Sequence, residues 1–291
     1  MAAESSAEVL GEAALSLRSH GCIALCQIVR AEGSTPGKVG WKLLARPDGT
    51  CFGNLGGGAF EAMVKTDAQR LLAAVVDGGR PRRAPGEVKR YYLTEEAVRG
   101  EPTGMVCGGM VEVFLEVILA SPVLAICDGG PVGQALARAA APAGFELLVA
   151  EDREAFRRPE LFPEGTRLAA VDREYGQDFL AAVAMRELYV AVVSRCWETD
   201  VAALAAVLRQ APPHLCYLGL MGSRRKVARV RGDLERRGVE LDGVGLRAPI
   251  GLPIGGDSPG EIAISILAEV IGTRYELASS SRSLQSSSSS A

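Results

Sequence analysis

The second half of the chain alternates short apolar runs with helical stretches, and this alternation constrains the fold more than any other feature. The apolar runs that predict strands are 123–127, 146–150, 167–171, 188–194 and 215–220. The predicted helices lie near 131–142, 176–186, 199–210, 223–237 and 259–272. Such alternation is typical of βαβ units, which build a parallel sheet covered by helices on both faces. We therefore expect a Rossmann-like, doubly wound α/β domain over 121–277. Its last helix is predicted to begin with a capping box formed by Ser258 and Glu261 around Pro259.

The first 120 residues follow a different pattern, in which strands predominate. Helices are predicted near 5–19 and 59–77, and strands over 22–30, 41–50, 89–94 and 110–119. A tight Pro-Asp-Gly turn at 47–49 favours antiparallel pairing. We expect an α+β domain over 1–120, a boundary near Ser121-Pro122, and a disordered serine-rich tail over 278–291.

Composition narrows the functional classes. The net charge is −3 and no long basic block lies outside 222–231, so we expect no extended nucleic-acid surface. No apolar segment approaches the ~18 residues of a membrane span, and the first residues lack the pattern of a signal peptide. We therefore expect a cytoplasmic protein without a membrane partner. The 7 cysteines show no paired CxxC spacing, which predicts reduced thiols. Two histidines in the whole chain argue against a His-based zinc site or a Ser-His-Asp triad, and we predict no metal site.

A glycine-rich turn follows the apolar run 123–127 and opens a predicted helix. Gly129, Gly130 and Gly133 have the outline of a dinucleotide-binding turn, and Asp152 ends the next strand, where an acidic residue can bind ribose hydroxyls. Asp128 stands where this fingerprint has its first glycine, and its charge would repel a pyrophosphate. We therefore expect weak affinity for NAD(P), or a different ligand.

A second candidate site follows the apolar run 215–220. Gly222 and Ser223 end that run, and Arg224, Arg225 and Lys226 open the next predicted helix. Unpaired N–H groups and the positive end of the helix dipole attract a phosphate or carboxylate there, and Arg adds bidentate contacts. Three cations at a helix start oppose the dipole, which favours an anionic partner. The alternative interpretation is a basic helical turn that faces solvent.

Glycines also cluster in the N-terminal domain. One cluster contains Gly33, Ser34 and Thr35; the other, 56–58, consists of three glycines that run directly into a helix. Consecutive glycines let the backbone approach a flat or phosphorylated ligand. Glu61 on the first helical turn could accept hydrogen bonds from ring N–H groups, or it could simply favour the helix dipole.

A third cluster places a cysteine in a glycine loop. Cys107 precedes Gly108 and Gly109 at the predicted start of a strand. A thiol in such a loop could act as a nucleophile or a soft metal ligand. It could equally be a small buried hydrophobe.

The ordered set of these motifs closely resembles the xanthine dehydrogenase accessory factor family, also called XdhC/CoxI. The segments that carry the resemblance are 33–61, 107–116, 127–137, 149–154, 189–195, 217–227 and 248–270. The resemblance implies a small N-terminal domain joined to a Rossmann-type domain. It also implies a protein that binds the molybdenum cofactor, a pterin dithiolene with a phosphate, protects it during sulfuration and inserts it into a molybdenum hydroxylase such as xanthine dehydrogenase.

On this basis we expect Glu61 and Cys107 to act on the cofactor. The residues expected to bind it are Gly33, Ser34, Thr35, Gly56, Gly57, Gly58, Gly108, Gly109, Asp128, Gly129, Gly130, Gly133, Asp152, Gly222, Ser223, Arg224, Arg225 and Lys226. The chain departs from the family at two places: members commonly have Gly-Ala-Gly-His where it has 128–131, and many have a histidine before the aspartate where it has 196–200. Asp128 or Cys196 could replace the missing imidazoles.

The sequence thus predicts a molybdenum cofactor chaperone without robust turnover of its own. The expected partners are a hydroxylase apoenzyme, a cysteine desulfurase and a second copy of the chain. The desulfurase would supply the sulfur, because nothing in this sequence resembles a PLP-lysine site. We also expect the glycine loops of the first half and the cationic corner of the second to share one cleft. Two alternatives are an NAD(P)-dependent oxidoreductase and a nucleotide-dependent transferase acting on the pterin; no G-x-x-x-x-G-K-[ST] loop supports the latter.

Overall fold

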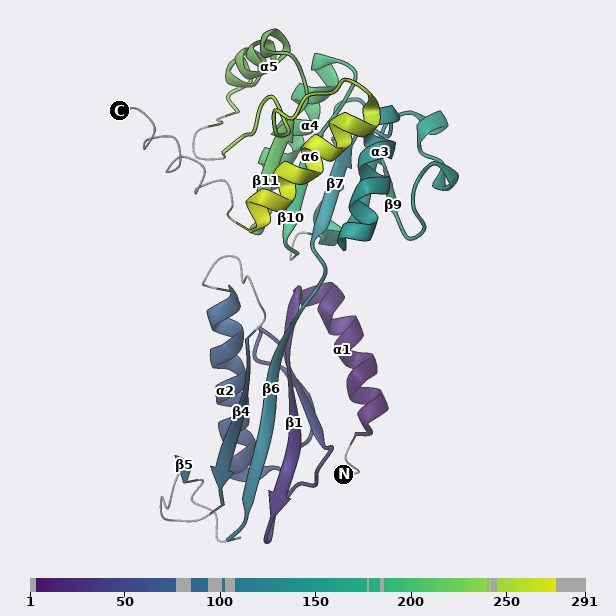
Figure 1. Cartoon of the computed structure of the whole chain (residues 1–291). Coiled ribbons are helices and arrows are strands. Elements are labelled where there is room, and N and C mark those ends of the chain that lie inside the picture. Colours follow the sequence, from purple (N-terminus) through teal and green to yellow (C-terminus); the bar gives the residue numbers. More distant parts are fainter. Residues whose placement is uncertain are drawn as a thin grey trace, which may run out of the picture. The chain divides into compact units, whose positions relative to one another are not determined.

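The computed structural model describes residues 4–76, 85–93, 101–102, 108–176, 178–183, 186–239, 241 and 245–275. The chain divides into two compact units, Met1–Ala120 and Ser121–Ala291 (Figure 1). The predicted tail over 278–291 and the candidate thiol of Cys107 lie outside the described residues.

The N-terminal unit contains a six-stranded sheet in the order β3-β2-β1-β6-β4-β5. Its strands are β1 (Cys22–Glu32), β2 (Lys42–Ala45), β3 (Cys51–Gly53), β4 (Gly86–Tyr92), β5 (Glu101–Pro102) and β6 (Met110–Leu119). All neighbours are antiparallel except β4 and β5, so the expected antiparallel pairing is confirmed.

Two helices cover opposite faces of this sheet, α1 (Ser6–His20) and α2 (Gly58–Val76). Successive side chains of a strand point to opposite faces. In β1, Cys22, Ala24 and Cys26 accordingly belong to the core under α2, whereas Ile23 packs with Val9 of α1. The strand therefore has almost no polar face over its first residues, as its apolar sequence predicts.

The C-terminal unit contains a five-stranded parallel sheet in the order β11-β10-β7-β8-β9. Its strands are β7 (Val123–Cys127), β8 (Glu146–Glu151), β9 (Arg167–Ala170), β10 (Leu188–Val192) and β11 (Leu215–Leu220). Sequence order runs outward from β7 in both directions, which places the topological switch point between β7 and β10. The predicted Rossmann-like architecture is confirmed.

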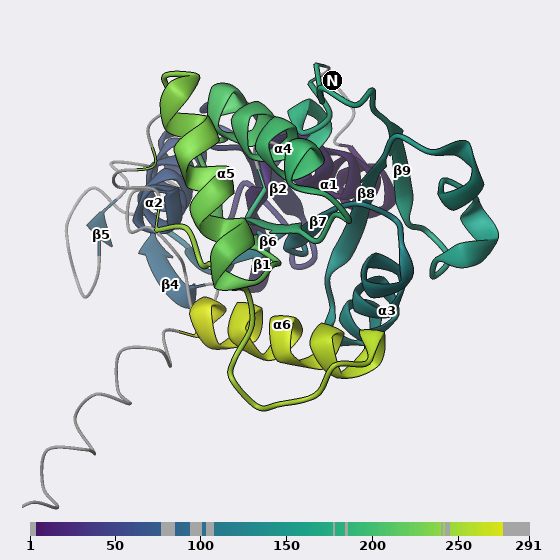
Figure 2. The ribbon, with the colours of Figure 1, turned by 90° about the horizontal axis from the view of Figure 1, so that it is seen from above.

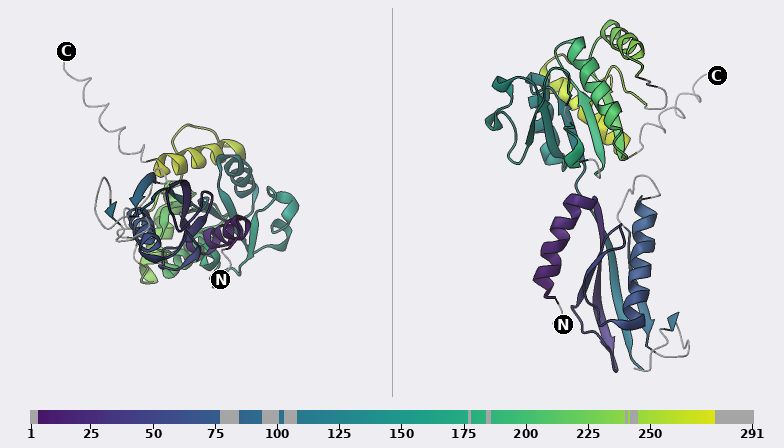
Figure 3. Two further views of the ribbon diagram at one scale, coloured as in Figure 1. Left: turned by 90° about the horizontal axis from the view of Figure 1, so that it is seen from below. Right: turned by 180° about the vertical axis from the view of Figure 1, so that it is seen from behind.

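Helices lie on both faces of the parallel sheet (Figures 2 and 3). One face carries α3 (Pro131–Ala140) and α6 (Pro259–Arg274), and the other carries α4 (Trp197–Gln210) and α5 (Arg224–Arg236). The predicted start of α6 is confirmed, because Ser258 and Glu261 form the capping box. No helix in the described part of the chain combines the length and the apolar character that a membrane crossing requires.

The prediction of a helix near 176–186 is wrong. Among the described residues of that span, the one regular element is a short 3₁₀ turn over Ala181–Val183. Just before it, the carboxylate of Asp172 accepts hydrogen bonds from the N–H groups of Glu174 (3.1 Å) and Gly176 (3.0 Å), and Tyr175 has a φ of 49°. Side-chain bonds of this kind stabilise turns at the expense of helices.

Candidate functional site

The first and third glycine clusters of the N-terminal unit lie against each other. A parallel β-bridge joins Ser34 to Gly108. A Cβ added to Gly109 would lie 2.2 Å from the carbonyl oxygen of Ser34, and one on Gly33 would lie 3.1 Å from the Cα of Gly109. Because real Cβ atoms essentially never approach to 2.2 Å, the two loops can touch in this way only if residue 109 is a glycine.

The second glycine cluster lies against the other end of the loop 33–37. A Cβ on Gly37 would lie 2.1 Å from the carbonyl oxygen of Leu55, and one on Gly56 would lie 2.6 Å from the carbonyl carbon of Pro36. Thr35 holds its own turn, since its hydroxyl donates to the carbonyl oxygen of Gly37 (2.9 Å). Three motifs that are far apart in the sequence therefore form one backbone patch.

Part of this patch is open to a ligand. Gly56, Gly57 and Gly58 have φ angles of 119°, 76° and 67°, in the region that favours glycine. A Cβ at Gly57 or at Gly108 would meet nothing within 4 Å, so space remains beside these two residues.

Glu61 holds the second loop in place. Its Oε2 accepts hydrogen bonds from the N–H groups of Leu55 (3.0 Å) and Gly57 (3.1 Å), and its Oε1 lies 2.8 Å from Nζ of Lys65. Burial alone would raise the pKa of Glu61, but Lys65 and the two N–H groups outweigh it and lower the pKa. The carboxylate is thus an ionised anchor for the loop, with both oxygens occupied.

The candidate site of the C-terminal unit lies at the carboxyl ends of β7 and β10. Ligands of open α/β sheets bind in the crevice outside this edge, at the switch point. Asp128 follows β7 directly and has a φ of 97°. Gly133 of α3 packs close behind it, because a Cβ there would lie 2.1 Å from the carbonyl oxygen of Asp128. Gly133 therefore allows the close helix–strand packing for which the last glycine of such a turn serves.

The N–H groups of the turn are occupied by the protein's own carboxylates. The N–H of Gly129 donates to Oε2 of Glu151 (2.7 Å), and the N–H of Gly130 donates to Oδ1 of Asp128 (2.7 Å). Glu151 is fully buried. A dinucleotide-binding turn offers such N–H groups to a pyrophosphate. In this chain a pyrophosphate would have to displace two carboxylates.

Arg153 compensates the charge of these carboxylates. Its guanidinium contacts Oε1 of Glu151 (2.8 Å) and Oδ1 of Asp128 (3.0 Å), and it stacks on the ring of Phe156. Burial would raise the pKa of Glu151, but Arg153 and the turn N–H outweigh it and lower the pKa. The pKa of Asp128 is raised, mainly by burial. The sequence indicates Glu151 and Asp152 as acidic residues at the end of this strand, but it did not predict that Glu151 binds the turn or that Arg153 pairs with it.

Arg195 is the second cation at this edge, and it is held loosely. Its guanidinium lies 3.7 Å from Oδ2 of Asp128 and 3.5 Å from Oδ2 of Asp152, and its side chain is 42% exposed. Oδ2 of Asp128 has no hydrogen-bond partner among the described residues. Within the same described ranges, no three His, Cys, Asp or Glu side chains are arranged to hold a metal ion.

Lys226 already has partners within the protein. Its Nζ lies 2.6 Å from Oδ2 of the buried Asp200 and donates to the carbonyl oxygens of Ser194 (3.0 Å) and Met221 (3.3 Å). The side chain of Lys226 runs past Gly222, where a Cβ would lie 2.7 Å from Cδ of the lysine. Burial raises the pKa of Asp200, and Lys226 and Ser194 offset part of that rise. The ammonium group is therefore occupied by three protein acceptors, and its role toward a ligand stays a prediction.

Arg224 and Arg225 remain available at the start of α5. The Ser223 hydroxyl caps the helix by accepting from the N–H of Lys226 (3.3 Å). Both arginines are exposed, and neither forms an ion pair with any residue that the structure describes. Two free guanidinium groups at a capped helix start can bind an anion.

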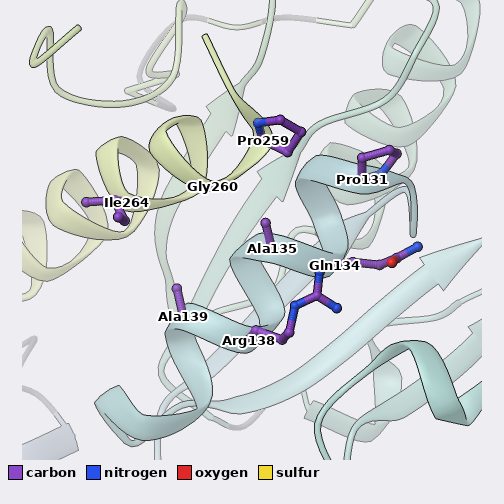
Figure 4. A pocket seen from close by; sticks show the side chains of 8 residues that line it. All are labelled: Pro131, Gln134, Ala135, Arg138, Ala139, Pro259, Gly260 and Ile264. Carbon is purple, nitrogen blue, oxygen red and sulfur yellow. The ribbon is translucent and has the colours of Figure 1, made fainter. Parts of the chain in front are cut away.

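A groove of about 640 Å³ is lined by residues of α3 and α6, two helices that pack against each other (Figure 4). Its walls are formed by Pro131, Ala135, Pro259 and Ile264 together with Gln134, Arg138, Ala139 and Gly260. The one charged group in this lining, Arg138, already donates to the carbonyl oxygen of Leu161 (3.1 Å). The groove is mostly apolar and offers no chemistry comparable to that of the strand edge.

Comparisons with known proteins match both units. Residues 124–270 match the family model described as the XdhC Rossmann domain, and residues 16–84 match the model of the XdhC and CoxI family. The uncharacterized protein YqeB of Escherichia coli K12 is 33% identical over 264 residues, which cover 89% of this chain and 45% of YqeB. A probable xanthine dehydrogenase subunit of Bacillus subtilis is 29% identical over 167 residues, covering 57% of this chain and 47% of that protein.

The chain thus spans about half the length of these curated relatives. Among solved structures, a xanthine dehydrogenase from Bacillus halodurans aligns over 97% of both chains with 20% identity and a TM-score of 0.46.

Proposed function

Because the chain belongs to the XdhC and CoxI family, we propose that it serves the maturation of a molybdenum hydroxylase of the xanthine dehydrogenase type. In this role it binds the molybdenum cofactor, supports its sulfuration and inserts it into the apoenzyme. The similarity to a probable xanthine dehydrogenase subunit of Bacillus subtilis supports this link. The further partners we propose are a cysteine desulfurase and a second copy of the chain, and the proposed location is the cytoplasm.

The observation that carries this proposal is the occupation of the Rossmann turn by Asp128 and Glu151. The alternative, an NAD(P)-dependent oxidoreductase, needs the N–H groups of Gly129 and Gly130 for the pyrophosphate. Those groups already donate to carboxylates at 2.7 Å, and a phosphate would meet like charge there. The turn therefore supports a ligand whose phosphate binds elsewhere.

The donor groups that are present fit the molybdenum cofactor. Arg224 and Arg225 lack protein partners among the described residues and can hold its phosphate at the start of α5. When bound, the cofactor supplies the molybdenum centre at which a terminal oxo ligand is exchanged for sulfido. The chain's own contribution is to bind and orient it, without robust turnover.

Cofactor retention tests this proposal. The full chain would be purified from cells that make the cofactor, and bound pterin would be measured by its fluorescence after acid oxidation. We expect retention by the natural chain, and an at least roughly tenfold loss in the variant Arg224→Ala/Arg225→Ala, because each phosphate contact is charge-assisted.

The matched control is Arg231→Ala/Arg237→Ala, which removes one exposed arginine from within α5 and one from its C-terminal end. It should leave retention unchanged. Absence of pterin from the natural chain, together with tight NAD⁺ or NADP⁺ binding, would overturn the proposal in favour of the oxidoreductase. Equal retention by both double variants would refute the phosphate assignment.

A further inference from the structure

Asp128 is a buried carboxylate with one unused oxygen. Its side chain is 6% exposed. Oδ1 accepts hydrogen bonds from the N–H of Gly130 (2.7 Å) and Nη2 of Arg153 (3.0 Å). Oδ2 has no hydrogen-bond donor among the described residues, and the guanidinium of Arg195 stays 3.7 Å away. Buried acceptors are nearly always paired, so an unpaired one calls for a partner.

The backbone of Asp128 is also strained. Its φ of 97° lies in the region that favours glycine, and the dinucleotide fingerprint has a glycine at this position. A glycine would avoid both the strain and the repulsion between the carboxylates of Asp128 and Glu151. Strained residues that persist in this way cluster at sites where ligands bind.

The unused oxygen lies where a ligand of this fold would bind. Asp128 follows β7 at the switch point of the sheet. Arg195 is the nearest cation, and its contacts of 3.7 Å and 3.5 Å are weak and partly in water. Arg195 can therefore move away and let a stronger donor reach Oδ2.

The charges at this edge select what that donor can be. The three carboxylates of Asp128, Glu151 and Asp152 lie near two guanidinium groups, those of Arg153 and Arg195, so one negative charge remains uncompensated and an N–H donor is favoured over an anionic group. We propose that Oδ2 of Asp128 accepts a hydrogen bond from the exocyclic amino group of a 2-amino-4-oxopyrimidine ring. This inference rests on the proposed function, because the pterin of the molybdenum cofactor contains that ring; guanine contains it too.

The same edge can accommodate the phosphate of such a ligand. Lys226 at the start of α5 donates to the carbonyl oxygen of Ser194, and the next residue, Arg195, contacts Asp128. The free arginines 224 and 225 precede Lys226 in the chain. Asp128 thus binds the amino group of the ring, while the rim of the crevice holds the negative charge.

Ring binding can be measured directly with the full chain and two fluorescent probes. One probe is pterin, and the other is lumazine, which has an oxo group in place of the 2-amino group. We expect the natural chain to bind pterin about tenfold more tightly than lumazine, as for one hydrogen bond to a charged acceptor. Asp128→Asn keeps an oxygen for Gly130 and Arg153 but replaces Oδ2 by an amide NH₂, so the preference should disappear.

Two further variants separate recognition from folding. Glu154→Gln removes an exposed carboxylate shortly after β8 that belongs to no predicted site, and it should keep the preference. Asp128→Gly relieves the strained backbone and removes the acceptor, so it should fold at least as well as Asp128→Asn and also lose the preference. Equal binding of both probes by the natural chain, or an unchanged preference in both Asp128 variants, would overturn the inference.

Guanosine as a third probe identifies the source of the ring. Tighter binding of guanosine with the same dependence on Asp128 supports the ring site and assigns it to a guanine nucleotide. Retention of the molybdenum cofactor by an Asp128→Asn protein whose ring preference is unchanged refutes this inference alone. Asp128-dependent pterin binding by a chain that never retains cofactor refutes the proposed function alone.

Discussion

Replacement of Lys226 by methionine tests whether this lysine is part of the core or part of a binding site. The substitution keeps the length of the aliphatic stem and removes the ammonium group. In the structure that group contacts Oδ2 of Asp200 at 2.6 Å and two backbone carbonyl oxygens. All three acceptors would lose their donor at once.

The magnitude follows from the burial of the pair. Asp200 is fully buried and the side chain of Lys226 is 20% exposed. Removal of one partner from a buried ion pair costs roughly 3–5 kcal/mol. Because some water reaches Lys226, we expect the lower end, about 3 kcal/mol of unfolding free energy for Lys226→Met. For a unit of this size that corresponds to a melting temperature lower by about 6–12 °C.

Urea unfolding at two pH values is the assay. Burial already raises the pKa of Asp200, and loss of Lys226 raises it further. A carboxyl group with a raised pKa in the folded state costs stability as the pH rises through that pKa. The deficit of Lys226→Met should therefore be smaller near about pH 5 than near about pH 8. Addition of Asp200→Asn should restore part of the loss, since the pair is coupled.

Arg225→Met is the matched control, because it removes a neighbouring cation that is exposed and without an ion pair among the described residues. Its effect on stability should stay within about 0.5 kcal/mol. A loss below about 1 kcal/mol for Lys226→Met, with no dependence on pH, would refute the structural role of the ammonium group. Lys226 would then be free to bind an anion, as the sequence alone indicates.

Two further predictions concern local structure. Gly133→Ala places a Cβ 2.1 Å from the carbonyl oxygen of Asp128 and should lower the free energy of unfolding by roughly 2–3 kcal/mol. Gly11→Ala, also inside a helix but with nothing within 4 Å of the added Cβ, should raise it by about 0.5–1 kcal/mol. Thermal unfolding that gives both changes the same sign contradicts this packing. Glu61→Gln should lower the free energy of unfolding by about 1 kcal/mol near neutral pH, because the loop loses a charged acceptor. Since the pKa of Glu61 is lowered in the folded state, this difference should shrink as the pH falls below 4.5. A constant difference in urea unfolding across that range would count against an ionised anchor.

The sequence predicted those parts of the fold that depend on local patterns. The strand β7 has five buried residues, and its continuous apolar run matches a parallel strand covered on both faces. The capping box at Ser258 formed as predicted because all of its atoms lie within one helical turn. The prediction of a helix near 176–186 was wrong, and the cause is local as well: the carboxylate of Asp172 binds two nearby backbone N–H groups and stabilises a turn.

The candidate site could be predicted only in part. The positions of Asp128 and Lys226 followed from the strand ends, but their partners come from other strands and helices. Nothing local shows that Glu151 turns inward to Gly129, 22 residues earlier in the chain, or that Lys226 reaches Ser194. A charged residue at a strand end therefore predicts at which edge of the sheet the site lies. Only the tertiary contacts distinguish a cation that is paired within the protein from a free one.

The contacts between the glycine loops of the N-terminal unit have a mechanical consequence. Because Gly109 has no room beside Ser34, and Gly37 has none beside Leu55, none of these segments can shift without displacing its neighbour. A molecule that binds the backbone at Gly57 or Gly108 should therefore reduce the mobility of all three glycine segments, 33–37, 55–57 and 108–109. We therefore expect that binding at either glycine slows hydrogen exchange in all three segments.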